Sequence, residues 1–291
     1  MFIIETKNLA KKYTDLTAVD RINLKVKEGE IFGLLGPNGA GKTTTLLMLA
    51  TLLRPTGGTA LVNGYDIVKQ SHQVRKSIGI VFQEPSSDDL LTGYENLRLH
   101  ALMYGVDRSI REKRIEEVLK LVDLTERKDD QVKKYSGGMR RRMEIARGLL
   151  HHPKVLFLDE PTLGLDPTAR EQAWEYIERL VKSEKITVII TTHYMDEADK
   201  LCDRIAIIDF GKVVALDSPN NLKRKMGGDI IRLKASSPNI EALKKLRFVK
   251  SIDSFDNTLS ITLKNADKHL QEVLNAAGKV ESAEILSLIH I

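Results

Sequence analysis

The residues with the clearest chemistry form the run Gly36-Pro37-Asn38-Gly39-Ala40-Gly41-Lys42-Thr43, which matches the pattern G-x-x-x-x-G-K-[ST]. This run follows Ile31 to Leu35, which predicts a strand, and leads into Thr44 to Leu53, which predicts a helix. The glycines let the backbone N–H groups and the helix N-terminus face a polyphosphate. Lys42 would neutralise the outer phosphates, and the Thr43 hydroxyl could ligate Mg²⁺. The run therefore predicts a phosphate-binding loop.

Two adjacent acids, Asp159 and Glu160, end the apolar run that begins at Val155. A bound nucleotide needs a carboxylate for its metal ion, and hydrolysis needs a group that orients the attacking water. Asp159 fits the metal role, and Glu160, one residue further on, fits the role of general base. Acid pairs at strand ends are also common as helix caps, so this interpretation depends on the phosphate-binding loop.

The string Ser136-Gly137-Gly138 stands before a helical pattern that contains Arg140-Arg141-Arg142. A serine and two glycines at a helix start gather free N–H donors and the positive end of the helix dipole, with no bulky side chain in the way. Alone, the string would predict Ser136 as a helix N-cap, but beside the two motifs above it predicts an anion site. We interpret the arginine run as a solvated helix face.

In their order these motifs resemble the nucleotide-binding subunits of ATP-binding cassette (ABC) transporters, over residues 2 to about 225. The resemblance implies that 36–43, with Thr44, is the Walker A loop that binds ATP, that Ser136, Gly137 and Gly138 are the centre of the signature motif, and that Asp159 and Glu160 form Walker B. It assigns further roles to single residues, with Tyr13 stacking on adenine, Gln83 contacting Mg²⁺ and water, Asp166 as the D-loop aspartate and His193 as the switch histidine. The metal ligands implied are Thr43, Gln83 and Asp159, and the catalytic set is Glu160, His193 and Gln83.

The signature departs from the commonest family form, Leu-Ser-Gly-Gly-Gln, because Tyr135 and Met139 take its first and last places. The Ser-Gly-Gly centre is intact, so ATP hydrolysis is still expected, while the fine contacts to the γ-phosphate are in question. Together with the strings Val81 to Pro85 and Thr191 to Ala198, this signature resembles the daunorubicin-resistance branch of bacterial drug exporters. That resemblance implies export of drugs or antibiotics, and export of lipid or glycolipid by the same machinery stays open.

The family resemblance also implies partners. The signature of one chain closes over the ATP held by another, so the expected unit is a head-to-tail dimer with a second copy or a sister cassette. The apolar runs are far shorter than the about 18 to 20 residues of a membrane-spanning helix. Separate transmembrane permease subunits are therefore expected, in contact with the loop from Glu84 to Tyr94, and the chain would be peripheral at the cytoplasmic face of the membrane.

The runner-up function is a non-transport ABC ATPase that acts on nucleic acid or ribosomes. The chain carries 45 basic and 40 acidic residues among 291, an excess too mild to indicate a nucleic-acid partner. The stretch from Thr43 to Ser136 is too short for the long coiled coil of repair ATPases, and the chain has one phosphate-binding loop where translation factors have two. No nucleic-acid partner is expected.

The single cysteine, Cys202, and the lack of a secretion signal predict a reducing, cytoplasmic compartment.

The elements that must position these residues alternate between β-branched runs and amphipathic stretches from Phe2 to about Leu216. This pattern predicts a parallel or mixed sheet flanked by helices. The family resemblance implies that this α/β fold is of the P-loop NTPase class, an ABC-type domain over 1–225 with a mixed sheet, flanking helices and a helical subdomain over about 90–150. Apolar spacing from Tyr94 to Leu124, interrupted near Gly105, predicts two helices. The expected strands are Ile31–Leu35, Ile78–Phe82, Val155–Leu158, Thr187–Thr191 and Arg204–Ile208.

A break in composition at Lys223 to Gly228 precedes a small α+β domain over 229–285. Its pattern predicts strand, helix, a hairpin that turns at Asp256-Asn257, helix and strand, which is the βαββαβ order of the split βαβ motif. A dimerisation or packing role is expected for it, and a ligand-sensing role stays open. Residues 286–291 match the translation of a transposon end used in sequencing-library preparation, so we expect them to be an adapter artefact.

Overall fold

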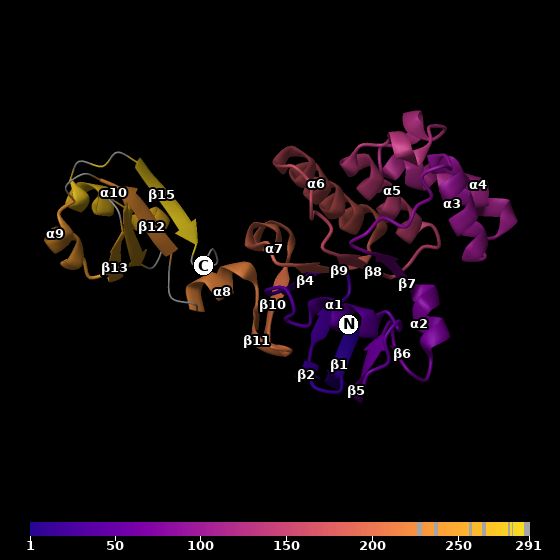
Figure 1. The fold of residues 1–291 in the computed structure, drawn as a ribbon, viewed down its shortest axis with the longest axis horizontal. Helices are drawn as coiled ribbons and strands as arrows, with labels where there is room; N and C mark the ends of the chain where they lie inside the picture. The colour runs from indigo at the N-terminus through magenta and orange to yellow at the C-terminus, as the bar shows by residue number, and fades with distance from the viewer. Residues whose placement is uncertain are drawn as a thin grey trace. The chain divides into compact units, whose positions relative to one another are not determined.

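The computed structural model describes residues 1–225, 229–235, 238–255, 258–263, 266–278, 280 and 282–287. The chain divides into two compact units, Met1–Leu216 and Asp217–Ile291, whose elements are drawn in Figure 1. The first unit holds every residue to which the sequence assigns a chemical role. The domain limits expected from the sequence, 1–225 and 229–285, stay predictions. None of the helices in the described part of the chain combines the length and apolarity that a bilayer crossing requires.

A six-stranded sheet in the order β11-β10-β4-β9-β8-β7 forms the centre of the first unit. Strands β10, β4, β9, β8 and β7 are parallel to one another, and β4, β9 and β8 are buried along their whole length. Strands buried on both faces read as unbroken apolar runs, which is why the five predicted strands are confirmed to within one residue at each end. The strands are β4 (Ile31–Leu35), β7 (Ile78–Val81), β8 (Val155–Asp159), β9 (Thr187–Thr192), β10 (Arg204–Asp209) and β11 (Lys212–Asp217).

A second sheet, in the order β2-β1-β5-β6 with β3 also paired to β1, was not among the strand predictions. Its pairings are antiparallel, one face packs on the core and the other meets solvent, so polar residues interrupt the apolar pattern. Register shifts in β1, where Asn8 has a φ of +50°, further break the alternation. The strands are β1 (Phe2–Lys12), β2 (Thr17–Ile22), β3 (Lys25–Lys27), β5 (Gly57–Val62) and β6 (Tyr65–Asp66).

Helix α1 (Lys42–Leu49) packs on strands of both sheets, with contacts to β2 and β5 on one side and to β8 and β9 on the other. One hydrophobic core therefore joins the two sheets and includes Ile4, Leu9, Phe32, Leu46 and Phe157. Figure 1 shows α1 in this position. The packing fixes the N-terminal turn of α1, and with it the phosphate-binding loop, at the carboxyl ends of the central strands.

The helical subdomain contains α3 (Gly93–Met103), α4 (Arg108–Leu121) and α5 (Gly137–Leu149), with short 3₁₀ turns η1 (Thr125–Arg127) and η2 (Val132–Lys134). The two helices predicted between Tyr94 and Leu124 are confirmed, and the interruption is at Gly105, whose φ is +67°. A capping box of Thr92 and Glu95 starts α3, and Asp107 caps α4. The other helices of this unit are α2 (Ser71–Ser77), α6 (Pro167–Glu184) and α7 (Met195–Leu201).

The second unit has a four-stranded sheet in the order β13-β14-β12-β15, with antiparallel pairs. Its buried side chains, among them Ile231, Leu233, Leu259 and Ile261, form a separate core with Leu243 and Val273 of its helices. The elements are α8 (Pro219–Lys225), β12 (Asp229–Lys234), α9 (Ile240–Lys244), β13 (Val249–Phe255), β14 (Thr258–Leu263), α10 (Ala266–Ala277) and β15 (Ser282–Ser287).

From β12 to β15 these elements follow the expected βαββαβ order. The turn predicted at 256–257 lies outside the described residues. Strand β15 pairs with β12 through Ser287, so the backbone of the first two residues of 286–291 joins the sheet. Residues 288–291 lie outside the described part, and their origin as an adapter artefact stays a prediction.

Candidate active site

The predicted phosphate-binding loop joins the end of β4 to the start of α1, in a space that only glycine fits at two positions. A Cβ atom at Gly36 would lie 2.2 Å from the carbonyl oxygen of Ile208. At Gly41, whose φ is +103°, a Cβ atom would lie 2.3 Å from the carbonyl oxygen of Ala18. The loop thus packs closely against one strand of each sheet, β10 through Ile208 and β2 through Ala18, so a side chain at either glycine would clash with backbone.

Lys42 lies beneath this loop with only 4% of its surface exposed. Its Nζ donates to the carbonyl oxygens of Gly36 at 2.9 Å and Pro37 at 3.0 Å, and lies 3.7 Å from Oε1 of Glu160. Burial lowers the pKa of the Lys42 amine, and the nearby carboxylates of Glu160 and Asp159 act in the opposite direction. A polyphosphate over the loop would supply further negative charge to this buried cation.

Asp159 ends β8 and is 4% exposed. Its Oδ1 accepts hydrogen bonds from the hydroxyl of Thr43 at 3.0 Å and from the hydroxyl of Thr191 on β9. The predicted metal ligands Thr43 and Asp159 are therefore in direct contact. Both supply oxygen atoms, which suits a hard cation such as Mg²⁺.

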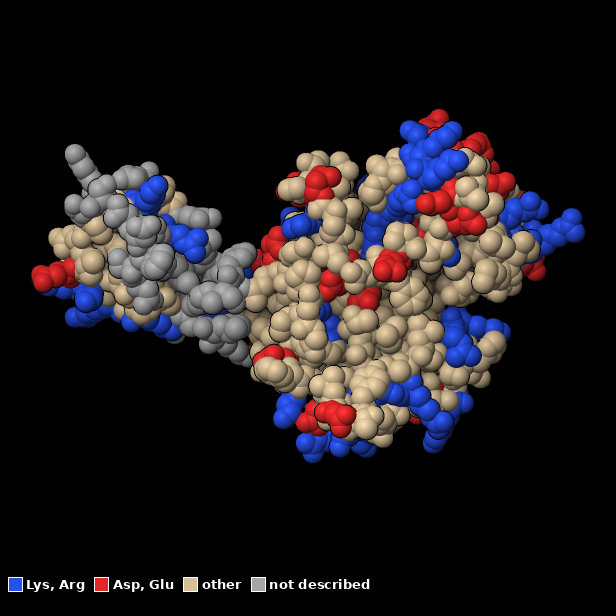
Figure 2. All heavy atoms as spheres, viewed as in Figure 1, with Lys and Arg blue, Asp and Glu red and all other residues tan. Residues whose placement is uncertain are grey.

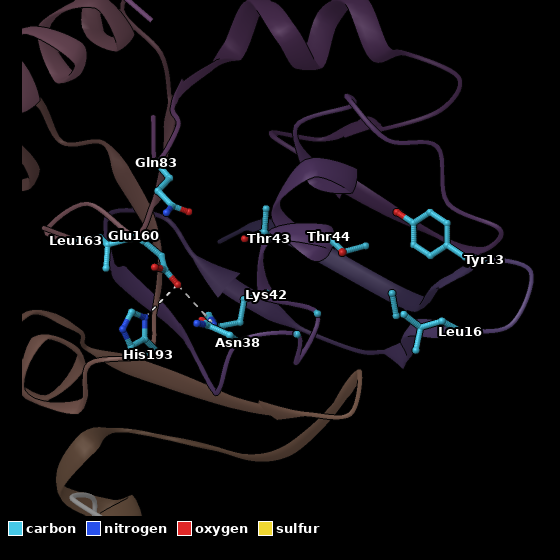
Figure 3. Close-up of a pocket in the computed structure, with 13 residues that line it drawn as sticks. Tyr13, Leu16, Asn38, Lys42, Thr43, Thr44, Gln83, Glu160, Leu163 and His193 are labelled. Atoms are coloured by element: carbon cyan, nitrogen blue, oxygen red, sulfur yellow. Dashed lines mark hydrogen bonds and ion pairs between the residues drawn. The ribbon is translucent and has the colours of Figure 1, made fainter. Parts of the chain in front are cut away.

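Glu160 follows Asp159 in an unusual backbone conformation, with a φ of +46°. Its N–H donates to Thr191, to the carbonyl oxygen at 3.1 Å and to the hydroxyl at 3.0 Å. Its carboxylate lies 3.1 Å from Nδ1 of His193, in a hydrogen bond whose donor is the ring nitrogen when the carboxylate is ionised. Figure 3 shows the Glu160 carboxylate between His193 and Lys42. The proposed base is thus oriented by a cation and a histidine.

Lys42, Thr43, Glu160 and His193 line a pocket of about 460 Å³, and Asp159 lies behind its lining, in contact with Thr43. In Figure 3, Tyr13 and Leu16 lie at one end of it, while Glu160, Gln83 and His193 lie at the other. Tyr13 is 46% exposed, as an aromatic surface for a base would need to be. The predicted residues that line the pocket are Tyr13, Asn38, Gly39, Gly41, Lys42, Thr43, Thr44, Gln83, Glu160 and His193. Leu16, Ala18 and Leu163 also line it and were not predicted.

Ser136, Gly137, Gly138 and Asp166 are not among the residues that line this pocket. Ser136 is exposed and caps α5, its hydroxyl accepting from the N–H of Met139 at 3.3 Å. Asp166 is likewise exposed and caps α6, its carboxylate accepting from the N–H of Ala169 at 2.9 Å. The structure of one chain therefore brings the predicted Walker A and Walker B residues together, and leaves Ser136 of the predicted signature and the predicted D-loop aspartate at the surface.

The interpretation of Arg140-Arg141-Arg142 as a solvated helix face is wrong for Arg141. Arg141 is only 8% exposed, and its guanidinium donates to backbone carbonyl oxygens of Phe82 and Asp159. The helical period contained the signal, since Arg141 is one and two turns before Ile145 and Leu149, which are both buried. Thr191, the shared partner of Asp159 and Glu160, was also missed, although it lies opposite Asp159 on the neighbouring strand β9, one residue before that strand ends.

The helical subdomain carries charged side chains of both signs. Figure 2 shows Lys and Arg interspersed with Asp and Glu over the helices α3 to α5 on the face in view.

Comparison with known proteins gives relatives that match the motifs and the fold. The ABC transporter family matches residues 19–163. The chain is 46% identical to the daunorubicin/doxorubicin resistance ATP-binding protein DrrA of Streptomyces peucetius, over 79% of this chain and 70% of DrrA. It is 39% identical to the linearmycin resistance ATP-binding protein LnrL of Bacillus subtilis, over 99% of this chain and 93% of LnrL.

Among solved structures, the dimeric ATP-binding cassette MJ0796 bound to ADP and Pi superposes with a TM-score of 0.66 at 29% identity. The match covers 74% of this chain and 98% of that cassette. The fold, the pocket and the relatives agree on one assignment. This chain belongs to the ATP-binding subunits of ABC transporters, and it is an ABC-type ATPase.

Proposed function

We propose that this chain hydrolyses ATP to power an ABC exporter of drugs or antibiotics. The observation that carries the proposal is the contact of Lys42, Glu160 and His193 at one end of the pocket, where the γ-phosphate of a bound ATP would lie. The names of DrrA and LnrL state resistance to daunorubicin, doxorubicin and linearmycin, which supports an antibiotic or related drug as the exported substrate.

In this proposal the pocket binds ATP along its length. Tyr13 stacks on adenine, the N–H groups of the loop from Gly36 to Thr44 hold the phosphates, and Lys42 offsets their charge. Mg²⁺ would be held by Thr43, Asp159 and Gln83, all oxygen donors, and would neutralise charge on the phosphate oxygens. The first two already lie 3.0 Å apart, and Gln83 lines the same pocket.

Hydrolysis then depends on the orientation of one water molecule. Glu160 accepts a proton from that water as general base, and His193 holds the carboxylate through the hydrogen bond from Nδ1. Gln83, at the same end of the pocket, would orient the water. Positioning and electrostatics carry most of the catalysis of phosphoryl transfer, so small displacements of these groups would have large effects on the rate.

The second half of the site comes, in our proposal, from a second copy of this chain, with a sister cassette as the alternative. Ser136, Gly137, Gly138 and Asp166 are outside the pocket of their own chain, and the exposed Ser136 and Gly137 start a helix that can receive an anion. The dimer formed by the related cassette MJ0796 supports this arrangement.

A permease subunit would complete the exporter, with this chain peripheral at the cytoplasmic face of the membrane. The segment from Glu84 to Tyr94, after Gln83, is the proposed contact. Asp89 in this segment forms an ion pair with Arg140, and the hydroxyl of Tyr94 donates a hydrogen bond to Glu112, so both side chains already have partners within the chain. Leu90 is 67% exposed and is the better probe of an external partner.

Two experiments test the proposal. Tagged Glu160→Gln protein with ATP, captured from solubilised membranes of its host, should bring down a polytopic membrane protein identified by mass spectrometry. Ribosomal or DNA-bound proteins in its place would contradict the proposal that the chain belongs to an exporter.

In the assembled complex, Leu90→Ser should lower transport and leave basal ATPase activity unchanged, whereas Val214→Ser, at a residue 61% exposed on β11, should change neither. Transport unaffected by Leu90→Ser would remove this segment from the contact.

A further inference from the structure

Arg141 is a buried residue that connects helix α5 with the ends of the strands β7 and β8. It lies on α5, one turn after the exposed Ser136, and is 8% exposed. Its Nη1 donates to the carbonyl oxygen of Phe82 at 2.6 Å, and its Nη2 donates to the carbonyl oxygen of Asp159 at 3.1 Å. Phe82 follows β7 and Asp159 ends β8, and these strands are neighbours in the central sheet. One guanidinium thus bridges the ends of two strands from a helix.

Both carbonyl groups belong to the peptide that precedes a proposed catalytic residue. The carbonyl of Phe82 shares its peptide plane with the N–H of Gln83, and the carbonyl of Asp159 shares its plane with the N–H of Glu160. Because the peptide is planar, the direction of the carbonyl fixes the direction of the next N–H and limits the position of the next Cα. Arg141 therefore acts on the backbone of Gln83 and Glu160 without contact with their side chains.

The backbone of Glu160 needs such a restraint. Its φ of +46° lies in the left-handed region, which is unfavourable for a residue with a Cβ and persists only where the surroundings hold it. The peptide between Asp159 and Glu160 is held on both sides, since its N–H donates to Thr191 and its C=O accepts from Arg141. Removal of one of the two restraints would let the Glu160 carboxylate leave its place beside Lys42 and His193.

The charge and the shape of the arginine side chain both suit these two hydrogen bonds. Burial lowers the pKa of Arg141 to about 10, with Glu144, Glu197 and Asp159 acting in the opposite direction, so the side chain stays a cation at neutral pH. A rigid guanidinium fork can reach two carbonyl groups at once, whereas a lysine offers donors from a single point.

We propose that Arg141 is a positioning residue that couples the signature helix to Gln83 and Glu160. The inference rests on the proposed roles of these two residues. Ser136 caps the helix that carries Arg141, so engagement of Ser136 by a nucleotide on a second chain would be passed along α5 to both carbonyl groups. The positions of Gln83 and Glu160 around the attacking water then depend on whether a nucleotide on a second chain contacts Ser136.

The test compares Arg141→Met and Arg141→Lys with a control on the full chain. Arg141→Met should lower kcat at least about tenfold, while KM for ATP and the affinity for a fluorescent ATP analogue stay within about twofold. Arg141→Lys should recover part of kcat, because the ammonium can still donate to one carbonyl. The control Arg179→Lys changes an exposed arginine that pairs with Asp123, and should match the wild type.

A double-mutant cycle with Glu160→Gln distinguishes positioning from a general loss of stability. Single-turnover hydrolysis is measured for each variant alone and for the pair. If Arg141 acts through Glu160, the two reductions do not multiply. Wild-type kcat in Arg141→Met, or an equal reduction in both backgrounds, would overturn the positioning role. If Arg141→Met does not fold, Arg141→Lys is measured in the same cycle. Rapid hydrolysis by Glu160→Gln alone would instead contradict the proposed base.

Discussion

The two groups of residues assigned to one ATP are held very differently within the chain. Lys42, Asp159 and Glu160 are buried or nearly so, and are joined by hydrogen bonds and ion pairs to the loop, to Thr43 or to His193. Ser136 and Asp166 are exposed, are not among the residues that line the pocket, and cap the helices α5 and α6. The first group is a prearranged site, and the second is a surface.

This difference indicates a site built in two halves. The buried half brings a cation, a carboxylate pair and a hydroxyl together before any ligand binds, so a single chain should bind nucleotide. In the dimer that we propose, the exposed half meets a phosphate when another chain supplies the buried half. Hydrolysis should therefore depend on residues that binding does not need, and substitutions in the two halves should separate these properties.

The largest expected effect comes from breaking the buried half at Lys42. Lys42→Ala removes a buried cation and its hydrogen bonds to Gly36 and Pro37. The charge-assisted hydrogen bonds that the ammonium would donate to the phosphates, roughly 1.5–3 kcal/mol each, are lost with it, so we expect ATP affinity to fall at least about 100-fold, with no measurable phosphate release. Titration with a fluorescent ATP analogue checks this. Lys182→Ala, at a side chain 78% exposed, is the matched control. Binding by Lys42→Ala at wild-type affinity would remove Lys42 from the phosphate site.

The next effect separates binding from hydrolysis within the buried half. Glu160→Gln keeps the size of the side chain and loses its basicity, so ATP affinity should stay within about threefold while the hydrolysis rate falls by roughly 10²–10⁴-fold. Glu175→Gln, at an exposed position of α6, should leave both unchanged. The readout is radiolabelled phosphate release together with the titration above. Loss of binding in parallel with the rate would mean that Glu160 holds the pocket together and is not the base.

A smaller loss of hydrolysis is expected when Ser136, in the exposed half, is changed. Ser136→Asp keeps a good N-cap for α5 but adds a negative charge where the second chain's phosphate should lie. We expect hydrolysis to fall about tenfold or more, with ATP affinity of the single chain and the free energy of unfolding unchanged. If Ser136 served only as a cap, Ser136→Asp would hydrolyse ATP at the wild-type rate.

The smallest effect concerns the capping role of Asp166. Asp166→Ala removes the acceptor for the N–H of Ala169 and should lower the free energy of unfolding by about 1 kcal/mol, whereas Asp166→Asn should keep most of it. Urea unfolding followed by circular dichroism measures both. Equal stability of Asp166→Ala and the wild type would show that this hydrogen bond adds nothing to α6.

The parts of the site that the sequence predicted are those in which local pattern and tertiary position agree. Strands β4, β8 and β9 are buried on both faces, so they appear as apolar runs, and the loop after β4 and the acids after β8 could be located from their ends. The fold of the second unit was predicted for a similar reason, since its strands and helices have clear periods.

The parts that could not be predicted depend on contacts between distant elements. The sheet of β1, β2 and β5 has a solvent face and register shifts, which remove the apolar runs. Arg141 looks like its neighbours in a basic run, and its burial is decided by the strand ends that α5 packs against. The surface position of Ser136 could not be read from its motif, because a phosphate site and a helix cap favour the same residue types.

The most direct test of the two-half account is the mass of Glu160→Gln in solution, measured by light scattering with and without ATP. Slow hydrolysis in this variant should keep ATP in place. The account predicts a monomer of 32.7 kDa without ATP and a dimer of twice that mass with ATP, and a return to monomer when Ser136→Asp is added. A protein that binds ATP and stays monomeric, or a dimer that Ser136→Asp leaves intact, would contradict it.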